Sequence, residues 1–307
     1  MSDRNEEYRV FKTRLKILLP EEYQECCEGV KPVSMGSAGL KFASNGRVAW
    51  DEMWASFCDL ALAGGPPHRG KLLEPATKAE ISAEAGRYQQ VVEEICRGIE
   101  MVTGLYAEES SIPGWVDVDC LNRTMAGWLV RAINIENVSA HAAGTILRLP
   151  AGPRFRIEKE IKNVITAIAK TSHYWSGHTS REQHRAVADL FEIMGSESAL
   201  IEVPLSSGGA QDASFSDLRN KVAGQIHSLT GLEATGCEYY GWLGVNYKNV
   251  PAAIWMMRAM VVSNVLCRRE DTSIYVPINP DSDHSGSRIV ALVGRAHDVA
   301  VAHGVLG

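Results

Sequence analysis

Apolar residues recur along the chain with helical spacing in long segments, and short runs of β-branched and aromatic residues separate these segments. In the first half, the pattern predicts strands at 72–75, 115–120 and 145–149 and helices at 77–103, 122–141 and 157–175. The second half repeats this order, with strands at 200–203, 242–247 and 273–276 and helices at 214–230, 249–268 and 284–303. Because a helix between two strands usually forms a crossover connection, we predict an α/β fold with a mainly parallel sheet covered by helices.

The two halves also match residue by residue. Shifted by 127 positions, the segment 114–153 aligns without a gap on 241–280, and 13 of its 40 positions are identical. We therefore predict a tandem duplication of a unit of about 127 residues with pseudo-twofold symmetry. The expected domains are an N-terminal segment at 1–50, a first α/β unit at 51–180 and a second at 181–307.

The N-terminal segment has no second copy. The sequence predicts helical structure over 7–19 and a hairpin around Ser44-Asn45-Gly46, because Asn-Gly suits a tight turn between strands. Asp51 is then expected to cap a helix that reaches Leu62.

Composition narrows the class of protein. The chain has 37 acidic and 31 basic residues, a net charge of −6 and no basic run, which argues against a nucleic-acid partner. No stretch of 18 apolar residues occurs, so we expect no membrane span. The seven cysteines are odd in number and form no C-x-x-C pair, which argues against a disulfide framework. A soluble cytoplasmic protein fits best.

Differences between the two copies point to candidate active-site residues. Residues that the fold requires are kept in both copies, whereas a single active site can use residues that only one copy has. Asp117 and Asp119 of the first copy stand opposite Gly244 and Asn246. Strand alternation places both aspartates on one face, where they could bind a divalent metal or act as acid and base. The alternative is that this face of the strand is simply exposed to water.

Glu136 is a third catalytic candidate, and it stands opposite Ser263 in the second copy. It lies on an apolar face of its helix, where desolvation would raise the pKa of its carboxyl toward the range of a general acid or base. A structural glutamate with a buried partner is the alternative.

Loops rich in glycine, proline and serine supply candidate ligand-binding residues. Arg154 and Arg156 stand at the start of a helix, where cations oppose the helix dipole unless an anion lies between them. Ser206, Ser207, Gly208 and Gly209 form a loop that could wrap an anion, or is an ordinary loop without a ligand.

The other irregular loop, 64–70, contains His68 and Arg69 between prolines and glycines. This loop is a candidate for contact with a ligand or with a second subunit, and the latter would make the protein a homo-oligomer.

His173, His178 and His184 form the only histidine cluster in the sequence. They are candidate ligands of a transition metal, although their spacing matches no standard zinc pattern. Exposed or helix-capping histidines are the alternative.

The sequence contains no nucleophile elbow, P-loop or dinucleotide-binding glycine pattern. Our leading hypothesis is an enzyme that acts on a small anionic metabolite by acid–base chemistry, with its site at the loops between the two repeats. The competing hypothesis is a non-catalytic protein that binds a ligand or assembles a complex. The sequence indicates no particular cofactor.

Overall fold

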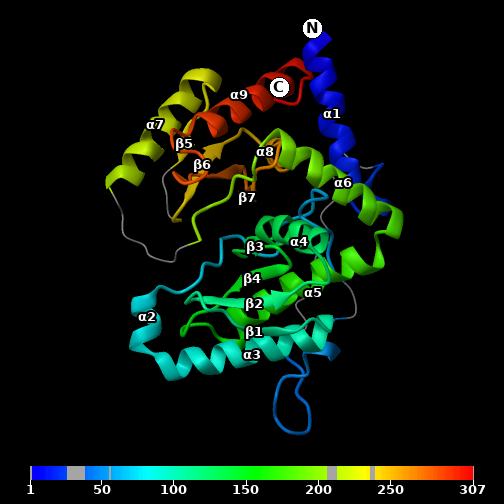
Figure 1. Ribbon diagram of the computed structural model, residues 1–307, viewed down its shortest axis with the longest axis vertical. Helices are drawn as coiled ribbons and strands as arrows, with labels where there is room; N and C mark the ends of the chain where they lie inside the picture. The colour runs from blue at the N-terminus through cyan, green and yellow to red at the C-terminus, as the bar shows by residue number, and fades with distance from the viewer. Residues whose placement is uncertain (1, 26–38, 55–56, 206–212, 236–238, 307) are drawn as a thin grey trace. The chain divides into compact units, whose positions relative to one another are not determined.

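The computed structural model describes residues 2–25, 39–54, 57–205, 213–235 and 239–306 (Figure 1). Contacts within the chain divide it into two compact units. The first unit is Val30–Ser180, and the second combines Met1–Gly29 with Arg181–Gly307. In the part of the chain that is described, no helix is both long and apolar enough to cross a membrane.

The first unit alternates helices with short strands. Its elements are a 3₁₀ turn η2 (Trp50–Glu52), α2 (Lys78–Ala83), α3 (Ala85–Thr103), β1 (Ala107–Glu109), β2 (Trp115–Asp119), α4 (Arg123–Ile135), β3 (His141–Ala143), β4 (Ile146–Pro150), a π-helical turn η3 (Ile157–Ile161) and α5 (Lys162–Gly177).

The strands of this unit form an antiparallel sheet with the order β1-β2-β4-β3, so the prediction of a mainly parallel sheet is wrong. The strands β1 and β3 have three residues each and are too short for periodicity to reveal. Helix α4 does cross from β2 to β3, and these two strands run in the same direction. However, β4 turns back from β3 and lies between them, so every neighbouring pair is antiparallel.

The two faces of this sheet differ. Val116, Val118, Leu147 and Leu149 are fully buried, and they pair directly across β2 and β4. Helix α3 contacts β1 and β2, α4 contacts β3 and β4, and α5 packs against both helices. The apolar face therefore lies in the core beneath a helical layer (Figure 1), and the other face carries the polar side chains of β2 and β4.

Asparagines shared by the two copies mark the ends of one helix in each. The side chain of Asn122 caps α4 by accepting a backbone N–H of the first turn at 2.9 Å, and Asn249 does the same for α8 (Val250–Val262). Asn137 and Asn264 then end these helices with φ of 61° and 62°, in the left-handed region that asparagine tolerates. The helix predicted over 122–141 therefore ends at Ile135.

The second unit has the same order of elements after its first helices. It contains α1 (Ser2–Leu18), a 3₁₀ turn η1 (Glu21–Tyr23), α6 (Arg181–Glu197), α7 (Ala213–Thr230), β5 (Ala234–Thr235), β6 (Trp242–Asn246), α8, β7 (Arg268–Glu270), β8 (Ser273–Pro277) and α9 (Ser287–Ala302). Its sheet order is β5-β6-β8-β7, and Trp242 pairs with Pro277 as Trp115 pairs with Pro150. Helix α1 packs against α6, α8 and α9.

The segment before α2 differs from the prediction. Only the 3₁₀ turn η2 forms where a helix from Asp51 to Leu62 was expected, and the described residues that follow are irregular or in turns. The predicted strands near 73 and 201 are reduced to single parallel bridges, from Leu73 to Val138 and from Ile201 to Val265.

Candidate active site

A loop of the first unit, residues 57–70, is fixed to the C-terminal end of α4 by Glu136. The Glu136 carboxylate accepts the backbone N–H of Ala61 at 3.0 Å and that of His68 at 2.7 Å. The backbone oxygen of Glu136 accepts the N–H of Arg69 at 3.3 Å. One buried residue therefore holds this loop at three points.

The geometry of this loop explains why positions 64 and 65 are both glycine. Gly64 has a φ of 97°, which favours glycine. A Cβ atom on Gly65 would lie 2.8 Å from the backbone oxygen of Asp59. The chain can turn back toward Glu136 only because these positions lack side chains.

Lys170 of α5 joins Glu136 to a cysteine of the same loop. Its ammonium nitrogen Nζ lies 2.8 Å from Glu136 Oε1 and donates a hydrogen bond to Cys58 Sγ at 3.2 Å. The side chains of Glu136 and Lys170 are 0% exposed. Tyr174, one turn further along α5, donates its hydroxyl to the backbone oxygen of Cys58 at 3.4 Å. We call Cys58, Glu136 and Lys170 the buried cluster.

Charge pairing sets the electrostatics of the buried cluster. Burial opposes the charge on Lys170, but the Glu136 carboxylate outweighs this and holds the pKa of the ammonium above its ordinary value. Lys170 is therefore protonated at neutral pH. Removing either partner would leave a buried charge unpaired, which typically costs about 3–5 kcal/mol.

His68 places an imidazole beside the cluster. Its Nε2 lies 3.0 Å from Oδ1 of Asn163, and an amide oxygen can only accept, so Nε2 carries the proton. Burial lowers the pKa of His68 more than the nearby Glu136 charge raises it. Nδ1 is consequently a neutral acceptor, and it is buried without a hydrogen-bond partner. This atom is chemically able to take up a proton.

The second copy lacks the charged pair. Ser263 stands opposite Glu136, and its hydroxyl donates to the backbone oxygen of Ala259 at 2.7 Å. His297 stands opposite Lys170. The second unit forms the same sheet without an ion pair at this position, so the fold itself does not require one.

The predicted aspartates lie elsewhere in the first unit. Asp117 pairs across the sheet with Arg148, whose Nε is 3.2 Å from Oδ1, and Asp119 is exposed at the end of β2. Both belong to the sheet face that points away from the core, whereas Glu136 is buried at the end of α4. The structure therefore does not bring the three catalytic candidates together.

The two arginines predicted to bind an anion are exposed and pair with glutamates of the protein. Arg156 bonds Glu160 through its backbone N–H at 3.0 Å and its guanidinium at 3.1 Å. Hydrogen bonds from Arg156 outweigh desolvation and lower the pKa of Glu160 to about 2. Arg154 lies 3.6 Å from Glu80. These carboxylates offset the cations at the helix start, so an external anion is not needed to explain them.

The remaining candidates are dispersed. His173 and His178 approach to 3.1 Å between their Nε2 atoms, whereas His184 belongs to α6 of the second unit. Among the described residues, no group of three or more His, Cys, Asp or Glu side chains could hold a metal ion. Ser206, Ser207, Gly208 and Gly209 lie outside the described residues.

Comparisons with models of protein families, with curated proteins and with solved structures find no match. The function is therefore inferred from the buried cluster and its surroundings.

Sequence reasoning missed two of the three residues of the buried cluster. Lys170 follows an almost wholly apolar run, 164–169, on a helix that was predicted to be buried. A lysine there indicates a buried counter-charge, and Glu136 in another apolar helix was the natural candidate. Cys58 lies in an irregular segment and gave no comparable signal.

Proposed function

We propose that the protein is an enzyme that acts on a small molecule by acid–base chemistry at the buried cluster. The observation that carries this proposal is Lys170, which is fully buried and contacts a carboxylate and a thiol at the same time. Reactive cysteines typically lie beside a cationic group, since the thiolate is the nucleophile.

Each residue then has a distinct role. Cys58 is the reacting group, and the ammonium of Lys170 stabilises the negative charge that develops on its sulfur when the thiol loses its proton. Glu136 is a positioning residue, because its carboxylate fixes Lys170 and the loop that carries Cys58. The neutral Nδ1 of His68 is the base assigned to take up the proton that Cys58 releases. The restriction of the charged pair to the first copy supports a functional role over a purely structural one.

The anionic character of the substrate stays a prediction. Its first motive, the pair Arg154 and Arg156, is accounted for by Glu80 and Glu160. Arg69, in the same loop as Cys58, is the basic residue that would have to hold an anion near the cluster. We also keep a cytoplasmic location as a proposal, supported by the free thiols of Cys58, Cys96, Cys120 and Cys267. Homo-oligomer formation likewise stays a prediction.

Turnover of small metabolites tests the proposed function. A panel of carboxylates, amides and amines is incubated with the protein, and consumption is followed by proton NMR. We expect Cys58→Ser to lower turnover by at least about 100-fold. Cys120→Ser is the matched control, because Cys120 is a buried thiol of the same unit whose pKa burial raises to about 12. Full turnover by Cys58→Ser would overturn the proposal.

A second candidate function is a non-catalytic ligand-binding protein in which the buried cluster only clamps the loop 57–70. The complete burial of Glu136 and Lys170 favours this reading. It predicts that Cys58→Ser changes stability and leaves ligand binding as it is.

A further inference from the structure

A cavity of about 410 Å³ opens on the first unit, within the range of small-molecule sites. Its walls are formed by Asp51, Trp54 and Phe57, by the C-terminal end of α3 and by one face of α5. Helix α5 contributes Ala169, Ser172, His173 and Ser176, which lie at positions i, i+3, i+4 and i+7 and therefore share a face.

One polar residue in the wall of this cavity has a hydroxyl without a partner. Ser172 is 7% exposed, and its hydroxyl oxygen makes no hydrogen bond. Serine hydroxyls on helices commonly bond the carbonyl one turn back, as Thr171 does with Ala167 at 2.8 Å. A buried hydroxyl without a partner costs about 1–3 kcal/mol. Because the oxygen itself is buried here, a ligand atom can bond it only after the serine side chain turns about χ1, and that bond would recover this free energy.

Aromatic rings line the cavity beside Ser172. Trp54 and Phe57 stack with ring centroids 6.1 Å apart and an interplanar angle of 28°. Phe57 in turn lies 5.3 Å from the imidazole of His173. A series of flat rings at the wall of a cavity favours a flat ligand, because offset stacking adds about 0.5–1.5 kcal/mol to the burial of its surface.

The charge around the cavity favours a neutral or cationic ligand. Among the residues that line it, Asp51 is the acidic one, and neither lysine nor arginine is present in this set. Helices α3 and α5 both end here, at Thr103 and Gly177, and the C-terminal end of a helix carries partial negative charge. An anion would be repelled, whereas N–H donors would be attracted.

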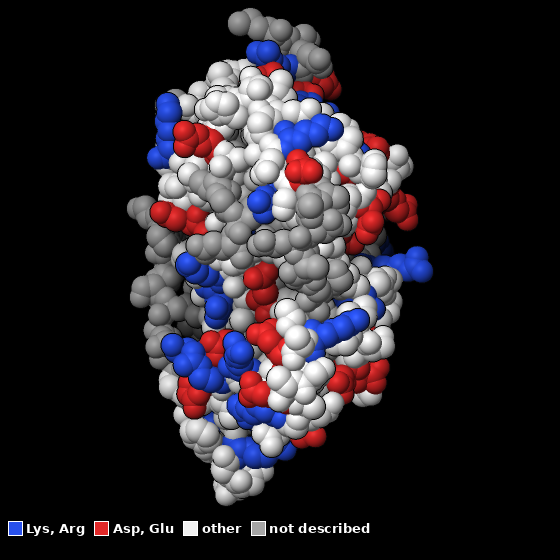
Figure 2. Space-filling model, turned by 90° about the vertical axis from the view of Figure 1, so that its left-hand side faces the viewer, with Lys and Arg blue, Asp and Glu red and all other residues white. Residues whose placement is uncertain are grey.

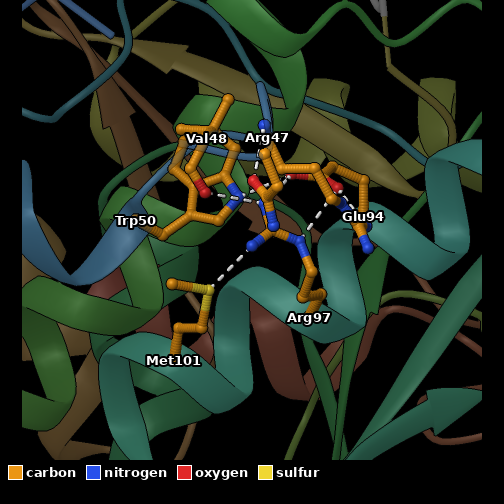
Figure 3. Close-up of polar contacts among 7 residues, drawn as sticks. Arg47, Val48, Trp50, Glu94, Arg97 and Met101 are labelled. Carbon is orange, nitrogen blue, oxygen red and sulfur yellow. Dashed lines mark hydrogen bonds and ion pairs between the residues drawn. The ribbon is translucent and has the colours of Figure 1, made fainter. Parts of the chain in front are cut away.

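The wall at η2 is held rigidly by Glu94 of α3 (Figure 3). Glu94 accepts hydrogen bonds from the side chains of Trp50 and Arg47, each at 2.8 Å, and from Arg97. Arg97 also donates to the backbone oxygen of Val48 at 2.8 Å. Although burial opposes it, these hydrogen bonds hold the pKa of Glu94 below its ordinary value, so the carboxylate is charged near neutral pH.

This arrangement fixes residues 47–50 on α3. It therefore anchors the chain directly before Asp51, the first lining residue, and Met101, which also lines the cavity, contacts the same Arg97.

We propose that this cavity binds a planar aromatic or heteroaromatic molecule that is neutral or positively charged and donates hydrogen bonds. The ring stacks on Trp54 and Phe57, and a cationic end lies near Asp51. An N–H group of the ligand bonds the Ser172 hydroxyl once that side chain has turned toward the cavity. This binding does not depend on the chemistry proposed for the buried cluster, so either proposal can fail without the other.

Two probes with the same ring and opposite charge test the proposal on the full chain. Benzamidine is a planar cation and benzoate a planar anion, and binding is followed by titration with proton NMR and tryptophan fluorescence. We expect saturable binding of benzamidine with a Kd on the order of 1 mM, a value typical of so small a ligand. Benzoate should bind at least about tenfold more weakly.

Variants locate the site. We expect Ser172→Ala to weaken benzamidine binding by about two- to tenfold, Asp51→Asn by a similar factor and Trp54→Leu more strongly. Ser139→Ala is the matched control, because Ser139 is as buried as Ser172, in the same unit, and outside the cavity. Circular dichroism confirms that each variant is folded. Absence of saturable benzamidine binding, equal binding of benzoate, or wild-type affinity in both Ser172→Ala and Trp54→Leu would overturn the proposal.

Discussion

Glu136 and Lys170 show how a single buried contact can bear on both stability and chemistry. Each charge is expensive to bury alone, and the 2.8 Å contact between them makes both acceptable. Sequence reasoning identified Glu136 and His68 as candidates, and the structure brings these two into direct contact. It could not identify Cys58, because nothing in an irregular loop indicates which side chain points inward.

A double-mutant cycle measures how strongly the pair is coupled. Glu136→Gln and Lys170→Met should each lower the free energy of unfolding by about 3–5 kcal/mol, because each leaves the other charge unpaired. The double variant should cost clearly less than the sum, since it removes both charges. Urea denaturation followed by circular dichroism gives these values, and additive costs would show that the two charges do not stabilise each other.

His68 should make stability depend on pH in a defined direction. Burial lowers its pKa in the folded protein below 6.5, so the unfolded chain takes up a proton first as the pH falls. The contribution of His68 to the free energy of unfolding is therefore fully present above about pH 6.5. It is lost as the pH falls toward the pKa of His68 in the folded protein. His68→Gln preserves a donor to Asn163. It should reduce the slope of the free energy of unfolding against pH by up to about 1.4 kcal/mol per pH unit.

Unfolding measured from pH 7.5 to 5 checks this prediction. His297→Gln is a useful comparison, because burial also lowers the pKa of His297, in the second unit. An unchanged slope in His68→Gln would contradict the assignment of a neutral imidazole.

At the scale of elements, the sequence pattern predicted the longer helices and strands but did not reveal the shortest strands. The strands β2 and β4 and the helix α4 follow from periodicity, and their cap residues are visible in the sequence. The direction of the sheet depends on β1 and β3, whose three residues carry no readable period. The predicted helix after Asp51 is wrong because its apolar residues form irregular structure, in which the side chain of Glu136 accepts the backbone N–H of Ala61.

Gly114 tests the packing of the entry to β2. Its φ is 90°, and a Cβ atom would lie 2.5 Å from the backbone oxygen of Ala76. Gly114→Ala should therefore lower the free energy of unfolding by more than about 2 kcal/mol. Gly104 has a similar φ of 71° but open space around it, so Gly104→Ala should cost about 1 kcal/mol. Equal costs would show that the backbone at Gly114 relaxes freely.

At the scale of the whole molecule, charge is mixed and the chain is divided into two units. Figure 2 shows basic and acidic side chains interspersed over the described part of one face of the protein. On this face, the described residues therefore provide no large field of one sign to steer a polyanion. The two units repeat one order of strands and helices, but only the first contains the buried cluster and the cavity lined by Ser172.

The membership of α1 in the second unit predicts a local response to mutation. Leu18 is fully buried, and the neighbouring Ile17 and Leu19 accept hydrogen bonds from Gln183 of α6. Leu18→Ala should cost about 2–5 kcal/mol and speed hydrogen exchange in α6, α8 and α9. Exchange in α3 and α5 should stay as in the wild type. Mass spectrometry of the exchanged peptides separates these regions, and uniform acceleration across both units would contradict the division.

The reactivity of Cys58 tests the central claim most directly. Wild-type protein is treated with iodoacetamide at pH 7, and alkylation of Cys58 and Cys120 is followed by peptide mass spectrometry. The two thiols are 5% and 3% exposed, so access is comparable. Because burial raises the pKa of Cys120 to about 12 and Lys170 contacts Cys58, we predict that Cys58 reacts at least about tenfold faster. The double variant Glu136→Gln/Lys170→Met should lose this difference. Equal rates in the wild type, or a rate at Cys58 that does not change in the double variant, would contradict the account.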